Sequence, residues 1–105
     1  MVADLALEQV ASTDAGVEVA VSGEIDVATS SQLRDFLDQL LDAGSSRILL
    51  DCRKLEFLDS SGIGVLVAAR NRLGDAGDII LDSPQPHVRK VLDITGVSSR
   101  LSVVP

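Results

Sequence analysis

The chain has 105 residues, of which 46% are hydrophobic and 24% are charged. This length and composition predict one domain, residues 1–105, with a single hydrophobic core. Sixteen acidic residues against nine basic ones give a formal net charge of −7. Such a surface repels nucleic acid and anionic lipid, so we expect no direct nucleic-acid binding, no membrane binding, and a partner protein with a basic surface.

In chain order, residues 5–10 and the alternating segment 17–23 predict two strands, joined as a hairpin by a short loop that contains glycine. Segment 29–43 follows, with apolar residues at i, i+3, i+4, i+7 and i+8, which is typical of a helix with one buried face. Candidate caps of this helix are three hydroxyl residues at its start and one glycine after its end: Thr29, Ser30, Ser31 and Gly44.

The unbroken apolar run at 47–51 predicts a central parallel strand that is covered on its faces. The next segment, 55–70, runs from a strand-like approach through an Asp-Ser-Ser-Gly turn into a helix, expected over 61–73. A further buried strand is expected over 78–82.

Ser83 and Pro84 are interpreted as the cap and the first residue of a third helix, which has an apolar stripe. Residues 101–104 predict a short edge strand or a docked tail. The resulting order is β-β-α-β-α-β-α-β. This order predicts the α/β class, as a mixed β-sheet with helices packed on it and right-handed crossovers between parallel strands.

Residue types that usually carry redox or metal chemistry are scarce. Cys52 is the single cysteine and closes an apolar run, so we interpret it as a small buried core residue. His87 has no neighbouring cysteine or histidine and is interpreted as a surface or capping residue at a helix start. We therefore expect no metal and no cofactor. The sequence shows no signal segment and no long apolar run, so a soluble, cytoplasmic protein is expected.

The Asp-Ser-Ser-Gly turn is the most chemically suggestive part of the chain, because it places Ser60 at a helix N-terminus. A hydroxyl there lies beside unpaired backbone N–H groups and the positive end of the helix dipole, which favour a phosphoryl group. A second polar cluster, Gly23-Glu24-Ile25-Asp26, also leaves a strand and enters a helix. If both strands end on one rim of the sheet, the two clusters are neighbours.

Other interpretations of these residues are weaker. Gly62-x-Gly64, with Asp82 about twenty positions on, is similar to a dinucleotide-binding fingerprint, but Val67 occupies the third glycine position and Asp59 would repel a pyrophosphate. A tight turn with a helix cap describes the same turn without any chemistry.

Two enzyme readings are also weak. A serine hydrolase using Asp59, Ser60 and His87 lacks the Gly-x-Ser-x-Gly elbow. Catalysis by paired carboxylates would draw on Glu24, Asp26 and Asp59, although carboxylates at such turns are usually caps or solvated surface. We therefore assign no catalytic residue and expect that the chain is not an enzyme.

Two motifs together resemble the STAS domain, and more narrowly the bacterial anti-sigma factor antagonists, or anti-anti-sigma factors. The first is G-E-I-D-x-A-T at 23–29, and the second is L-x-F-L-D-S-S-G-I-G-V-L at 55–66. A later segment with Pro86, Val88, Val91, Leu92 and Gly96 also matches. The resemblance covers nearly the whole chain and implies a single STAS domain.

The resemblance implies a phosphorylation switch. In this family the serine after the aspartate, here Ser60, is phosphorylated by the anti-sigma factor, itself a serine kinase, and a serine phosphatase reverses the reaction. The unphosphorylated form binds the anti-sigma factor and frees the sigma factor for transcription. The residues expected to bind the partner are Glu24, Asp26, Asp59, Ser60, Ser61, Gly62 and Gly64. Asp26 and Asp59 are expected to orient the hydroxyl or contact the kinase, and the two glycines to leave the helix end open.

The residues alone do not choose between Ser60 and Ser61, which stand side by side. A second reading of the same domain is a STAS scaffold without kinase regulation, or a transporter-associated subunit of a lipid-transport ABC system, which would bind its partner through the same rim.

Overall fold

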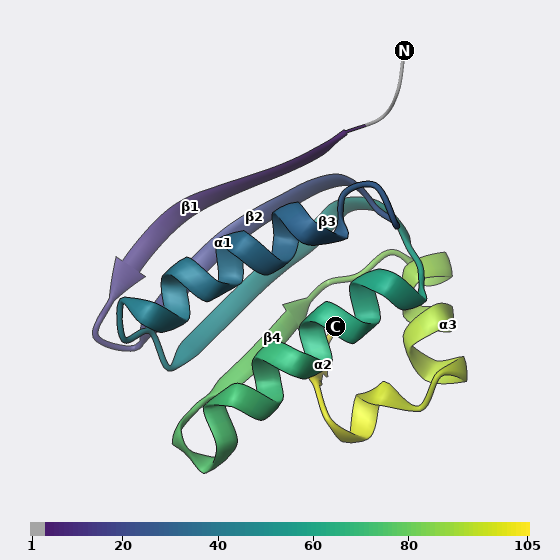
Figure 1. Cartoon of the computed structure of the whole chain (residues 1–105). Helices are drawn as coiled ribbons and strands as arrows, with labels where there is room; N and C mark the ends of the chain where they lie inside the picture. Colours follow the sequence, from purple (N-terminus) through teal and green to yellow (C-terminus); the bar gives the residue numbers. More distant parts are fainter. Residues whose placement is uncertain (1–3) are drawn as a thin grey trace.

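The computed structural model describes residues 4–105 and contains one five-stranded sheet, with the strands in the order β1-β2-β3-β4-β5 (Figure 1). The strands are β1 (Leu5–Thr13), β2 (Gly16–Ile25), β3 (Arg47–Leu58), β4 (Asp78–Asp82) and β5 (Ser102–Val104). β1 pairs with β2 antiparallel, and every other neighbouring pair is parallel. The predicted α/β class, the hairpin and the C-terminal edge strand are confirmed.

Three α-helices connect the parallel strands: α1 (Ser30–Asp42), α2 (Ser60–Leu73) and α3 (Pro86–Ile94). Two short 3-10 helices follow α2 and α3, namely η1 (Gly74–Ala76) and η2 (Val97–Ser99). α1 and α2 lie side by side over one face of the sheet (Figure 1). The strands turn alternate apolar side chains into the core, where they meet buried residues of all three helices, including Leu37, Leu66 and Leu92.

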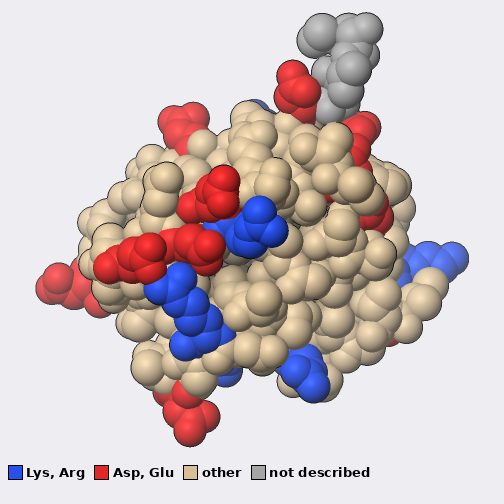
Figure 2. All heavy atoms as spheres, in the orientation of Figure 1, with Lys and Arg blue, Asp and Glu red and all other residues tan. Residues whose placement is uncertain are grey.

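α1 and α2 are joined at their surface by charge as well as by packing. Arg72 of α2 forms ion pairs with Asp38 and Asp42 of α1. Figure 2 shows red and blue side chains meeting over this part of the molecule. These groups are partly exposed, so the pairs contribute little to the free energy of unfolding and mainly neutralise Arg72.

β3 is longer than the sequence indicates. The expected strand ends at Asp51, where the apolar run gives way to charged residues, but the observed strand continues for seven residues to Leu58. Its pairing with β4 stops at Asp51, and beyond that point it pairs with β2 alone, with two irregularities in register. Leu55 and Leu58 are buried in this extension, while its charged residues are exposed. The extension therefore has apolar core positions, but the charged residues between them interrupt the continuous apolar run.

Two predicted helix caps are wrong. The Thr29 hydroxyl does not cap α1; it donates to Glu24 O at 2.8 Å and accepts from Asp26 N at 2.9 Å, which ties the turn back to β2. α3 begins at Pro86 rather than at Pro84. Ser83 is unavailable as a cap because its N–H donates to Val104 O and its hydroxyl to Pro105 O, which ties it to the C-terminal strand.

His87 and Cys52 have the roles that the sequence indicates. His87 is exposed in the first turn of α3, with Nε2 2.5 Å from Glu56 O in the extension of β3. Gln85 Nε2 donates to Arg53 O at 3.0 Å in the same extension. Cys52 is 2% exposed in the core, and burial raises the pKa of its thiol to about 12.

We expect Cys52 to resist alkylation in the native protein. At pH 8 a thiol with a pKa near 12 is thiolate about a thousandfold less often than an unperturbed cysteine, and burial also blocks the reagent. Iodoacetamide labelling followed by mass spectrometry should show almost no adduct without denaturant and complete labelling in guanidinium chloride. Rapid labelling of the folded protein would contradict this placement.

Candidate functional site

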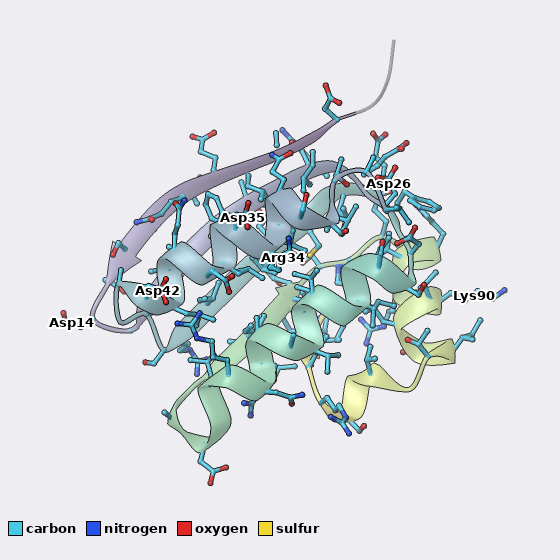
Figure 3. All side chains as sticks on the ribbon, in the orientation of Figure 1. Asp14, Asp26, Arg34, Asp35, Asp42 and Lys90 are labelled. Atoms are coloured by element: carbon cyan, nitrogen blue, oxygen red, sulfur yellow. The ribbon has the colours of Figure 1, made fainter. Side chains whose placement is uncertain are left out.

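The site lies where β2 and β3 end together. Ile25 and Leu58 are paired at the last rung of the two parallel strands, and Asp59 N donates to Ile25 O at 3.2 Å. Parallel strands present their carboxyl ends at the same edge of the sheet. The turns at Asp26 and Asp59 are therefore neighbours, as the sequence analysis expects, and Figure 3 shows Asp26 at the same end of the molecule as the start of α2.

Asp59 builds the start of α2. It has an extended backbone conformation, and its Oδ1 accepts hydrogen bonds from Ser61 N at 3.0 Å and Gly62 N at 3.4 Å. Two of the N–H groups that the helix leaves unpaired are satisfied in this way. The cap makes Ser60 the first helical residue, and its side chain is exposed to solvent.

The structure distinguishes the two serines. Ser61 is half-buried, and its hydroxyl donates to Asp59 Oδ1 at 2.5 Å, so its proton is already committed. Ser60 makes no side-chain hydrogen bond within residues 4–105 and is exposed. A hydroxyl that has no internal partner and faces solvent is the one that an incoming enzyme can reach.

Asp26 and Asp59 accept hydrogen bonds from backbone N–H groups of their own turns and not from the Ser60 hydroxyl. Asp26 Oδ1 accepts from Ala28 N at 2.9 Å and Thr29 N at 3.1 Å, which closes the turn into α1. Within residues 4–105, no hydrogen bond joins the Ser60 hydroxyl to Asp26 or Asp59. Of the two roles expected for these carboxylates, orienting the hydroxyl therefore has no support in the structure.

Gly62 does not leave the helix end open, and that expectation is wrong. It is buried, and a Cβ added there would lie 2.4 Å from Ile25 Cγ2 and 2.7 Å from Leu58 Cδ1. The absence of a side chain lets α2 start directly against the ends of β2 and β3. Gly64 differs, because it is exposed and an added Cβ would meet nothing within 4 Å.

The two glycines give a paired test of this packing. Gly62→Ala should lower the free energy of unfolding by about 1–3 kcal/mol, because a methyl group must displace core side chains. Gly64→Ala should raise it by about 0.5–1 kcal/mol, because alanine is the better helix former and the space is open. Urea denaturation measures both values. Equal changes in the free energy of unfolding for the two substitutions would contradict the close packing at Gly62 and the open space at Gly64.

Sequence reasoning missed an apolar part of the rim. Val27, in the turn between β2 and α1, is 80% exposed, and Phe57, which pairs with Glu24 across the two strands, is 44% exposed. Large apolar side chains at such exposure beside a polar turn are a common sign of a docking surface. The sequence does place both residues directly beside the polar residues of the two motifs, and this position could have identified them.

Around Ser60 the charge is negative. Glu24 lies near the end of β2, and Asp26 and Asp59 lie on the two turns. None of the three takes part in an ion pair within residues 4–105. No group of three or more histidine, cysteine or acidic residues in the described part of the chain could hold a metal ion. Over the same residues, no helix is both long and apolar enough to cross a membrane.

Comparison with known proteins decides the family. A family model described as "Mlab, STAS domain" matches residues 8–105. The chain belongs to the STAS domain family. BtrV of Bordetella bronchiseptica, named a putative anti-sigma factor antagonist, is 31% identical over 86 residues, which cover 81% of this chain and 72% of BtrV.

Solved structures agree with this placement of the STAS chain. An anti-sigma factor antagonist from Mycobacterium paratuberculosis superposes with a TM-score of 0.82 at 25% identity, covering 98% of this chain and 86% of that one. SpoIIAA in its unphosphorylated form has a TM-score of 0.74 at 30% identity, covering 96% and 88%. Bacillus SpoIIAA in its phosphorylated form has a TM-score of 0.69 at 29% identity, covering 96% and 91%. The comparisons support an anti-sigma factor antagonist.

Proposed function

We propose that this STAS domain binds an anti-sigma factor through the rim around Ser60, and that phosphorylation of Ser60 switches the binding off. The observation that carries the proposal is the exposed Ser60 hydroxyl, unpartnered within residues 4–105, at the N-terminus of α2. A similar protein, SpoIIAA, is known in phosphorylated and unphosphorylated forms. The partner is an anti-sigma factor that is itself a serine kinase, and its sequestration releases the sigma factor for transcription.

The partner kinase carries out the phosphoryl transfer. The Ser60 oxygen attacks the γ-phosphorus of ATP bound to the kinase, the bond from that phosphorus to the oxygen of ADP breaks, and the hydroxyl proton passes to a base of the kinase. A serine phosphatase restores the hydroxyl by hydrolysis. This chain supplies an exposed hydroxyl on a rigid helix start and needs no cofactor of its own.

The helix start tolerates the phosphate in the free protein. A phosphoserine adds a charge of about −1.5 to −2. The first turn of α2 offers the positive end of the helix dipole and the N–H of Ser60, since the N–H groups of Ser61, Gly62 and Ile63 already donate to Asp59. Repulsion from each rim carboxylate opposes this by about 1.4 kcal/mol per unit pair, taking a separation of roughly 6 Å and an effective dielectric of about 40. The two effects partly cancel, so the fold persists.

The phosphate weakens binding to the partner more than it strengthens it. A partner surface shaped around a neutral hydroxyl has to bury a doubly charged group, and removing such a group from water costs several kcal/mol without an opposing cation. Affinity should therefore fall well beyond tenfold. The residues proposed to contact the partner are those exposed or half-buried at the rim: Glu24, Asp26, Val27, Phe57, Asp59, Ser60, Ser61 and Gly64.

The phosphorylation site is tested by two neighbouring serine substitutions. After incubation with purified anti-sigma factor kinases of the source genome and ATP, wild type and Ser61→Ala should gain one phosphate, and Ser60→Ala none. Intact-mass spectrometry measures the product. Phosphate on Ser60→Ala at the wild-type level would overturn the assignment, and Ser61→Ala controls for general damage to the turn.

The docking surface is tested by two exposed apolar residues. Val27→Asp should weaken partner binding by at least about tenfold, because a charge replaces apolar contact area at the rim. Ile94→Asp is the matched control, since Ile94 is 74% exposed but lies at the end of α3. Both variants should keep the wild-type melting temperature. Equal loss of affinity, measured by calorimetry, would place the partner elsewhere.

The alternative, a scaffold or transporter-associated subunit, predicts a different partner on the same rim. Affinity capture from the source cell with wild-type protein and with Val27→Asp separates the two proposals. Recovery of a sigma-regulating kinase by wild type alone supports the antagonist, whereas recovery of a transporter ATPase supports the alternative.

A further inference from the structure

A polar cavity lies away from Ser60. It has a volume of about 430 Å³ and is lined by residues from the last part of α2, the start of β4, α3, η2 with the two residues after it, and β5. Arg70, on its wall, is ten residues along α2 from Ser60, or about 15 Å of helix. The other residues used below are Arg89, Asp93, Ser98 and Arg100.

Positive charge is concentrated in this cavity. The chain has only nine basic residues against sixteen acidic ones, yet three of the nine line this one space. Arg70 is fixed in the wall, with Nε 3.2 Å from Asp78 Oδ1 and Nη1 donating to Gly74 O at 2.6 Å. Ser102 Oγ donates to the other oxygen of Asp78 at 2.5 Å and Ile79 N donates to Oδ1 at 2.9 Å, so both oxygens of this carboxylate already accept a hydrogen bond.

Arg89 and Arg100 have no such partner. Within residues 4–105, neither has an acidic oxygen within 4.0 Å, whereas Arg53 and Arg72 are both ion-paired. Asp93 lies one helical turn from Arg89 and also lines the cavity, but the two do not pair. Ser98 makes no side-chain hydrogen bond in the same part of the chain. The cavity therefore holds unused hydrogen-bond donors on two segments, α3 and the stretch from η2 to Arg100.

We propose that this cavity binds a small phosphate-bearing molecule, with its phosphate held by Arg89, Arg100 and Ser98. Guanidinium groups match phosphate oxygens in both charge and geometry, and a hydroxyl adds a neutral donor. The volume is in the range of small-molecule sites and exceeds what a single ion needs. No aromatic residue lines the cavity, so recognition rests on the phosphate rather than on stacking of a base.

The net charge of the lining fits an anion. Three arginines and two aspartates give +1, against −7 for the whole chain. Asp93 faces the same space and sets a preference, because it would repel a second phosphate near it while accepting a hydroxyl of the ligand. A monophosphate ester with hydroxyl groups therefore fits better than a polyphosphate.

The test is a titration of the whole ¹⁵N-labelled protein with glycerol phosphate, at constant ionic strength, followed by amide chemical shifts. We expect saturable shifts at residues 97–102 and around Arg89. Arg89→Gln and Arg100→Gln should each weaken binding about tenfold, which is the loss of one charge-assisted contact. Sodium sulfate and pyrophosphate in parallel titrations show whether the site favours the monoester.

Lys90→Gln is the matched control. It removes the same charge from the neighbouring position of α3, but Figure 3 shows the Lys90 side chain pointing out into solvent. This variant should bind glycerol phosphate as wild type does, and all three variants should keep the wild-type melting temperature.

Three results would overturn the proposal: an equal loss of affinity in Lys90→Gln, shifts that do not saturate, or shifts confined to the start of α2. None of them bears on the phosphorylation of Ser60, because the two sites lie at different ends of α2 and are read out separately.

Discussion

The hydrogen bonds accepted by Asp59 determine the rest of the site. This carboxylate takes the N–H groups of Ser61 and Gly62 and the hydroxyl of Ser61, and so closes the first turn of α2. One consequence is that Ser60 becomes the first helical residue and faces solvent. The other is that its neighbour loses its free hydroxyl. A single carboxylate thus leaves only one of the two adjacent serines with an exposed hydroxyl that has no hydrogen-bond partner within residues 4–105.

The cap works only because the backbone beneath it is anchored. The last rung between β2 and β3, together with the hydrogen bond from Asp59 N to Ile25 O, brings two turns that are more than thirty residues apart to one rim. Gly62 lets the helix start directly on Ile25 and Leu58. Rigidity under the helix and exposure at its tip suit a switch in which a phosphate alters docking without disturbing the core.

Much of this architecture can be predicted from the sequence. Alternation in residues 17–23, the apolar run at 47–51 and the helical periodicity of 29–43 each specify their element locally. The order of elements then predicts a mixed sheet with helices packed on it, without the order of its strands. The failures share a cause, which is that a long-range contact decides them. β3 continues past Asp51 because β2 continues beside it, and α3 starts late because Ser83 is bonded to Val104 and Pro105.

The location of the candidate site could be predicted from the sequence, but the contacts within it could not. The two motifs locate the rim and name Ser60, but periodicity cannot show which hydroxyl Asp59 engages, or that Gly62 is buried while Gly64 is open. The cavity lined by Arg70, Arg89 and Arg100 leaves no local pattern at all, because its residues come from α2, α3 and the loop after η2. Such sites become visible only when the chain is folded.

The most direct test of the switch compares the protein fully phosphorylated on Ser60 with the unmodified protein. Amide chemical shifts report the fold, and calorimetric titration with the anti-sigma factor reports docking. We predict shifts confined to the start of α2 and the turn after β2, with an affinity reduced at least about a hundredfold. A phosphorylated protein that binds with undiminished affinity, or one whose core shifts throughout, would contradict the account.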